Sequence, residues 1–205
     1  PALETLLSGP TALDYSGSGL PAGHFVDAIA FDGSGQMYGI TSAFPYPYTH
    51  YLVKIDPATG VVTDPKLITG LPVPTDPTEE LTELLDYDSS TGYLWGIWAN
   101  DPTDPQNPAD GNDIRLVKIN LSTGAAELVI PLINPRPDVV LVNGDISVDR
   151  NGQIYALVTS EIIKGSPPTT FYEMQVLTFD KVTGQITFLG QPIPVLDTES
   201  IDFKN

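Results

Sequence analysis

The chain has 205 residues and 41% hydrophobic content, so it can bury a substantial core and does not have the composition of a disordered protein. Its 26 acidic and 9 basic residues give a formal net charge of −17, which disfavours nucleic acid and anionic membrane surfaces as partners. The absence of cysteine excludes disulfides, thiolate metal sites and cysteine nucleophiles.

A two-part motif occurs three times along the chain. Its first part is an apolar-x-apolar-Asp segment, a turn that ends in Gly, and a segment with an aliphatic and an aromatic residue. Its second part is an aliphatic segment that ends in Thr-Gly. The three copies span residues 27–60, 84–124 and 145–184. A repeat of this length is typical of propellers and solenoids.

The first part of each copy predicts a hairpin of two strands. In the first copy, Ile29 and Phe31 alternate with other residues, which is the period of a strand with two different faces. The Asp that follows can cap the turn, and the Gly can adopt positive φ. The next strand carries an aromatic residue at one shared register, where we expect packing between blades: Tyr38, Trp95 and Tyr155.

The second part of each copy predicts two more strands. A third strand leads to the Thr-Gly turn, and a fourth strand leaves it. Four antiparallel strands per repeat make a propeller blade. The sequence therefore predicts a single all-β, β-propeller-like domain over 1–205, with three complete four-stranded blades at about 27–70, 82–133 and 145–192.

The two ends of the chain resemble parts of a further blade. Residues 199–205 resemble the first strand of a blade, and residues 2–8 resemble a fourth strand. We therefore expect a split or incomplete blade formed by the two termini. Closure within one chain, pairing with neighbouring molecules in a ring or filament, and a fragment of a longer protein all remain open. The predicted assembly residues are Leu3, Leu6, Leu7, Ile201 and Phe203.

These blade motifs resemble the repeats of bacterial extracellular β-propeller proteins, including surface proteins and lactonase-like or streptogramin-lyase-like propellers. The resemblance covers about residues 27–205 and implies the blade architecture. In the enzymes of this group, metal ligands and acid-base residues point into the central channel. The sequence contains no matching set of His or Glu residues, so the resemblance implies no catalytic residue here.

A loop rich in aromatic residues and proline lies between the second and third strands of the first repeat. Aromatic rings can stack on sugars or form subunit contacts, and a stiffened loop whose tyrosines cover the neighbouring blade is the alternative. Trp98, on the opposite strand face from Trp95, is a further candidate, with packing between blades as its alternative. The candidate ligand or interface residues are Phe44, Tyr46, Tyr48, His50 and Trp98.

The corresponding loop of the second repeat is rich in Asp and Asn. Their side-chain oxygens suit a hard cation such as Ca²⁺, whereas a solvated turn explains the same composition. No other cofactor is expected. The candidate metal ligands are Asp101, Asp104, Asp110, Asn112 and Asp113.

The acidic segment 76–88 contains Leu81, Leu84 and Leu85 at helical spacing, which predicts a short helical turn before the next strand. The start of the chain at Pro1, without Met or a signal sequence, favours a processed protein that is secreted or displayed at the cell surface.

The absence of a catalytic motif favours a non-enzymatic structural or adhesive module that assembles with itself through its terminal strands. The first alternative is a lectin-like propeller that binds cell-surface glycan through the two unusual loops. The second alternative is a metal-dependent lactonase-like or lyase-like enzyme.

Overall fold

The computed structural model describes residues 12–43, 49–72, 80–99, 114–136, 139–164 and 169–195. These ranges contain three separate four-stranded antiparallel sheets and no helix. This confirms the predicted all-β, propeller-like fold with three four-stranded blades. We also find no helical segment in these ranges with the length and hydropathy that a membrane span requires.

Each sheet follows the chain order of its strands, so each blade is an up-and-down meander. Blade 1 consists of β1 (His24–Phe31), β2 (Met37–Ala43), β3 (Tyr51–Ile55) and β4 (Val62–Leu67). Blade 2 consists of β5 (Glu80–Asp88), β6 (Tyr93–Ala99), β7 (Arg115–Asn120) and β8 (Ala126–Pro131). Blade 3 consists of β9 (Val139–Val148), β10 (Ile154–Lys164), β11 (Thr169–Phe179) and β12 (Ile186–Val195).

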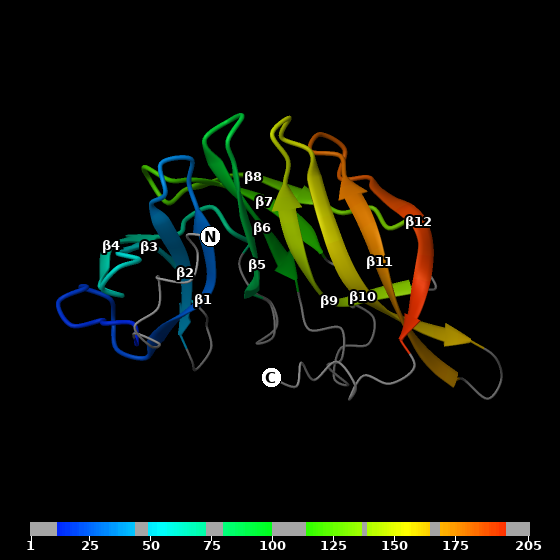
Figure 1. Cartoon of the computed structure of the whole chain (residues 1–205), viewed down its shortest axis with the longest axis horizontal. Helices are drawn as coiled ribbons and strands as arrows, with labels where there is room; N and C mark the ends of the chain where they lie inside the picture. Colours follow the sequence, from blue (N-terminus) through cyan, green and yellow to red (C-terminus); the bar gives the residue numbers. More distant parts are fainter. Residues whose placement is uncertain are drawn as a thin grey trace, which may run out of the picture.

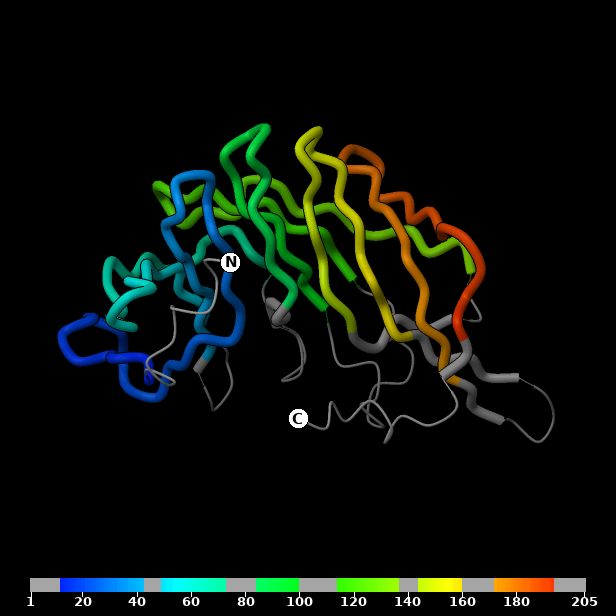
Figure 2. The backbone as a smooth tube through the Cα atoms, in the orientation of Figure 1, coloured from blue at the N-terminus to red at the C-terminus, as the bar shows by residue number. Residues whose placement is uncertain are grey.

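The three blades lie side by side in the order of the chain (Figure 1). The first strands face one another across the blade junctions, with β1 against β5 and β5 against β9. The tube drawing shows the same order from blade 1, in blue and cyan, to blade 3, in yellow and red (Figure 2). The first strand of each blade is therefore its inner strand, and the fourth strand is its outer one.

The hairpin turn between the first and second strands of each blade has the predicted cap. Asp32 Oδ1 accepts hydrogen bonds from the backbone N–H groups of Ser34 and Gln36, at 2.8 and 3.0 Å. Asp149 makes the same pair of bonds to Asn151 and Gln153 in blade 3. The closing glycines have positive φ, at 86° in Gly35, 78° in Gly92 and 78° in Gly152. We call this end of the blades the turn pole.

Successive blades are also joined at their outer edges by one repeated contact. The second residue after the outer strand of one blade forms a parallel bridge with the residue after the Thr-Gly turn of the next blade. Thr69 bridges Ala125 in this way, and Ile133 bridges Gln185. Asp14 makes the same bridge to Val61 of blade 1. The segment before blade 1 thus lies where the exit of a preceding blade would lie.

Two apolar clusters fill the junctions between blades. One lies between blades 1 and 2 and includes Tyr38, Ile40, Leu85 and Trp98. The other lies between blades 2 and 3 and includes Trp95. The two tryptophans of β6 therefore point to opposite sides of blade 2, as their positions predicted.

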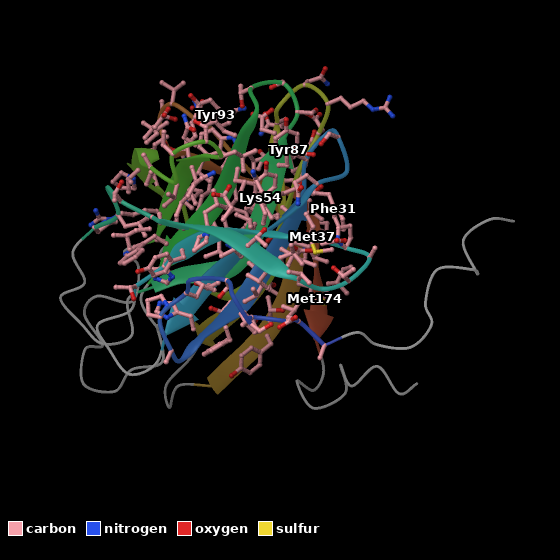
Figure 3. All side chains as sticks on the ribbon, turned by 90° about the vertical axis from the view of Figure 1, so that its left-hand side faces the viewer. Phe31, Met37, Lys54, Tyr87, Tyr93 and Met174 are labelled. Atoms are coloured by element: carbon pink, nitrogen blue, oxygen red, sulfur yellow. The ribbon has the colours of Figure 1, made fainter. Side chains whose placement is uncertain are left out.

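A third cluster covers the free side of blade 1. Val53, Ile55 and Val62 pack there against residues of the segment that precedes β1, among them Leu13 and Tyr15. The described residues leave the inner strand on the same side uncovered, and Ile29 and Phe31 are 51% and 50% exposed. Figure 3 looks onto this side and shows Phe31 beside Met37, its partner across the β1–β2 pair.

The predicted helical turn within 76–88 is wrong for the part of this segment that the structure describes. Residues Glu80–Asp88 form the strand β5. An irregularity in the pairing with β6 separates Leu81 from Leu85, so the spacing of the leucines arises from a bulged strand.

Candidate functional site

The candidate site lies at the end of blade 1 opposite the turn pole, at the junction with blade 2. The start of β1, the end of β2, the start of β3 and the end of β6 meet there. These strand ends supply His24, Thr41, the segment 49–51 and Trp98. We call this end the open pole.

His50 and Trp98, two of the predicted site residues, are in contact across the blade junction. Their rings meet edge to face, with centroids 6.1 Å apart and an interplanar angle of 75°. Both side chains are buried, at 3% and 2% exposure. Because both are inaccessible to a ligand, Trp98 acts in packing between blades, and His50 forms part of the buried layer beneath the accessible residues of the site.

Burial keeps the His50 imidazole neutral. Loss of solvent lowers its pKa from 6.5 to about 4, and a hydrogen bond with the backbone of Thr41 opposes this shift only in part. The Thr41 hydroxyl is itself fully buried, with no hydrogen-bond partner among the described residues. The floor of the site is therefore an uncharged layer of low polarity.

Three residues that the sequence analysis did not select form the accessible part of the site. The rings of His24 and Tyr51 meet edge to face at 5.0 Å, with an interplanar angle of 82°. His24 Nε2 lies 3.1 Å from the exposed hydroxyl of Thr49, and His24 Nδ1 lies 3.1 Å from the backbone oxygen of Pro21. Both residues are half-buried, so each is packed on one side and partly accessible to solvent.

The sequence alone did not indicate His24 and Tyr51 as a pair, because they lie 27 residues apart and neither belongs to a known motif. His24 begins β1, and the register places it opposite Ala43. Tyr51 lies opposite Thr41 on the next strand pair. The first and third strands of one blade thus bring the two rings together. A prediction of the pairing register of all the strands in the blade would have been needed to find this contact.

The remaining predicted site residues lie outside the described residues. These are the loop aromatics Phe44, Tyr46 and Tyr48, the metal candidates Asp101, Asp104, Asp110, Asn112 and Asp113, and the assembly residues Leu3, Leu6, Leu7, Ile201 and Phe203. Within the described ranges, no group of three or more His, Asp or Glu side chains is placed to hold a metal ion.

Comparison with solved structures finds proteins with a similar arrangement of strands. An endo-1,4-β-xylanase from Bacteroides thetaiotaomicron VPI-5482 is 12% identical, with a TM-score of 0.43 over 83% of this chain and 60% of its own. The protein described as Bacteroides ovatus xyloglucan PUL GH43B is 16% identical, with a TM-score of 0.41 over 82% of this chain and 32% of its own. The chain therefore spans less than two thirds of either structure.

No protein-family model and no curated protein sequence matches the chain. The structural comparison contradicts the predicted non-enzymatic structural or adhesive module, because the first of the two solved structures is named as an enzyme that acts on a polysaccharide. The prediction that the chain is not an enzyme is withdrawn with it.

Proposed function

We propose that the open pole of blade 1 binds neutral carbohydrate. The observation that carries this proposal is the edge-to-face pair of His24 and Tyr51 beside the Thr49 hydroxyl. Such a cluster offers apolar ring surface together with hydrogen-bonding groups, which is the combination that a sugar ring presents in return. In the sequence, the predicted aromatic residues Phe44, Tyr46 and Tyr48 lie between β2 and β3, the strand that Tyr51 begins.

The charge of the protein restricts the ligand to uncharged sugars. A formal charge of −17 repels phosphorylated, sulfated and uronic-acid ligands at long range, whereas it leaves neutral glycans unaffected. The neutral state of His50 beneath the surface agrees with this restriction, since a neutral imidazole does not attract an anion. A Ca²⁺ ion held by the Asp-rich loop 100–113 and a location outside the cell both stay part of the proposal.

Calorimetric titration with oligosaccharides tests the proposal. Neutral xylan and xyloglucan fragments are suitable first ligands, because the names of the two solved structures refer to these polysaccharides. We expect Tyr51→Ala to weaken binding about tenfold, about 1.4 kcal/mol, through loss of one ring face. Tyr93→Ala is the matched control, because Tyr93 is a half-buried tyrosine at the turn pole that also begins a strand.

Equal affinity of the wild-type protein and Tyr51→Ala for every bound sugar would exclude this site. Failure of the wild-type protein to bind any neutral glycan, with and without added Ca²⁺, would exclude the function itself. Analysis of the same samples for shortened oligosaccharides shows whether binding leads to hydrolysis.

A further inference from the structure

The free side of blade 3 carries an exposed apolar face. Tyr155 and Leu157 on β10, Val176 on β11 and Leu189 on β12 are 37%, 45%, 40% and 38% exposed. The strand register makes them one patch, because Leu157 lies opposite Val176, and Val176 lies opposite Leu189. A continuous apolar patch across three strands indicates a contact surface.

The same positions are buried in the other two blades. The repeat aligns Tyr155, Leu157 and Val176 with Trp95, Ile97 and Leu116 of blade 2, and with Tyr38, Ile40 and Leu52 of blade 1. The blade 2 residues are 2%, 4% and 0% exposed, and those of blade 1 are 8%, 1% and 1% exposed. The exposure in blade 3 thus comes from the lack of a following blade among the described residues, and not from a change of residue type.

The two observed junctions show which residues cover this face. In each junction, the inner strand of the following blade contributes two apolar residues. Leu85 and Tyr87 of β5 pack in the cluster with blade 1, and Ile146 and Val148 of β9 pack in the cluster with blade 2. An occupant of the blade 3 face must therefore supply an apolar-x-apolar strand.

We propose that residues 199–205 of this chain bind the blade 3 face as the inner strand of a fourth blade. The segment contains Ile201 and Phe203 with one residue between them, which matches the spacing of Ile146 and Val148. In this arrangement Ile201 takes the position of Leu85 and Ile146, over the Tyr155 and Leu157 pair.

The chain is long enough for this contact. The outer strands of blades 1 and 2 end at Leu67 and Pro131, and the next inner strands begin at Glu80 and Val139. The outer strand of blade 3 ends at Val195, and five residues, 196–200, lie between it and Ile201. This segment spans up to about 20 Å when extended, which exceeds the roughly 15 Å between the first and fourth strands of one sheet. The tether also raises the local concentration of the segment far above that of a second molecule.

Two further features of blade 3 suit an apolar strand at this place. A hollow of about 190 Å³ lies next to Leu157, between β9, β10 and β11, and Thr159 and Met174 contribute to its lining. In blade 2, Asp86 Oδ2 accepts a 2.6 Å hydrogen bond from the backbone N–H of Val148 in the following blade. Ser147 occupies the position of Asp86 in blade 3 and offers a hydroxyl to the equivalent N–H, that of Phe203.

The absence of native cysteine permits a direct test by cross-linking. The double variant Leu157→Cys with Ile201→Cys is oxidised under mild conditions and analysed by non-reducing mass spectrometry. We expect an intramolecular disulfide that forms at least about tenfold faster than in the control pair Val182→Cys with Ile201→Cys. Val182 is 86% exposed and lies in the turn between β11 and β12, so it reports random encounters.

Similar rates in the two pairs would overturn the proposal, and so would a disulfide between two molecules, which would assign the face to a second copy. A second measurement does not depend on disulfide geometry. Ile201→Asp together with Phe203→Asp should increase the binding of a hydrophobic dye while the far-ultraviolet circular dichroism stays unchanged. Unchanged dye binding in this variant would also contradict the proposal.

Discussion

Lys181 Nζ lies 3.0 Å from Asp88 Oδ2 and joins blade 3 to blade 2 at the turn pole. Asp88 is fully buried, and it also accepts hydrogen bonds from the Ser90 hydroxyl at 2.5 Å and from the Trp95 indole at 3.3 Å. A single carboxylate thus caps its own turn, orients the tryptophan of the junction and binds a cation of the next blade.

Replacement of Lys181 tests the contribution of this ion pair. We expect Lys181→Met to lower the free energy of unfolding by about 1 to 3 kcal/mol, because it leaves a buried carboxylate without its cation. Lys54→Met is the control, since Lys54 pairs with Asp64 and both side chains are about 40% exposed, at 39% and 42%. Urea denaturation should show almost no change for the control. Equal losses in both variants would contradict the role of the buried pair.

The same carboxylate gives an acid-sensitive junction. Burial raises the pKa of Asp88, but the hydrogen bonds from Ser90, Lys181 and Thr91 outweigh burial, and the pKa lies well below its usual 3.8. The stabilisation is therefore complete above about pH 3.8 and is lost as the pH falls further. Asp88→Asn should be less stable than the wild type at pH 7, and this difference should shrink below pH 3.8. A constant difference down to pH 2 would contradict this assignment.

His50 gives a second pH dependence, in a higher range. Its pKa is lowered to about 4 by burial, so the unfolded chain binds a proton between pH 6.5 and 4 while the folded chain does not. The free energy of unfolding should fall by up to about 3 kcal/mol across this range as the pH decreases. The chain contains only two histidines, so an NMR titration can follow the His50 imidazole directly. His50→Gln should remove this part of the pH dependence.

The sequence predicted the parts of the fold that depend on neighbouring residues. The turns begin with Asp32, Asp88 and Asp149 and end in glycine, and both signals act within four or five residues. The burial of Tyr38 and Trp95 also followed from the repeat. Tyr155 has the same place in the motif and is exposed, because its burial depends on a blade that follows and not on its own sequence.

The candidate site was predicted less well, because it combines residues from distant strand ends. His50 and Trp98 were both selected, but their contact joins two blades and 48 residues of sequence. Because both side chains are buried, they pack beneath the site and do not make the ligand contact that had been predicted for them. The accessible pair of His24 and Tyr51 results from the register of a whole blade, which local motifs do not contain.

The bridge between the outer edges of blades 2 and 3 should depend on Gly184. This residue has φ of 74°, and a Cβ atom there would clash with the backbone oxygen of Pro131. Gly92 also has a positive φ, of 78°, but a Cβ atom there would meet open space. Replacement of Gly92 therefore shows the effect of backbone strain without a clash. We expect Gly92→Ala to lower the free energy of unfolding by about 1 to 2 kcal/mol, through strain alone. Gly184→Ala should lower it by clearly more in urea denaturation, because Ile133 must also move away from Gln185 and break their parallel bridge. Equal losses in the two variants would show that the edge contact between blades adds nothing to stability.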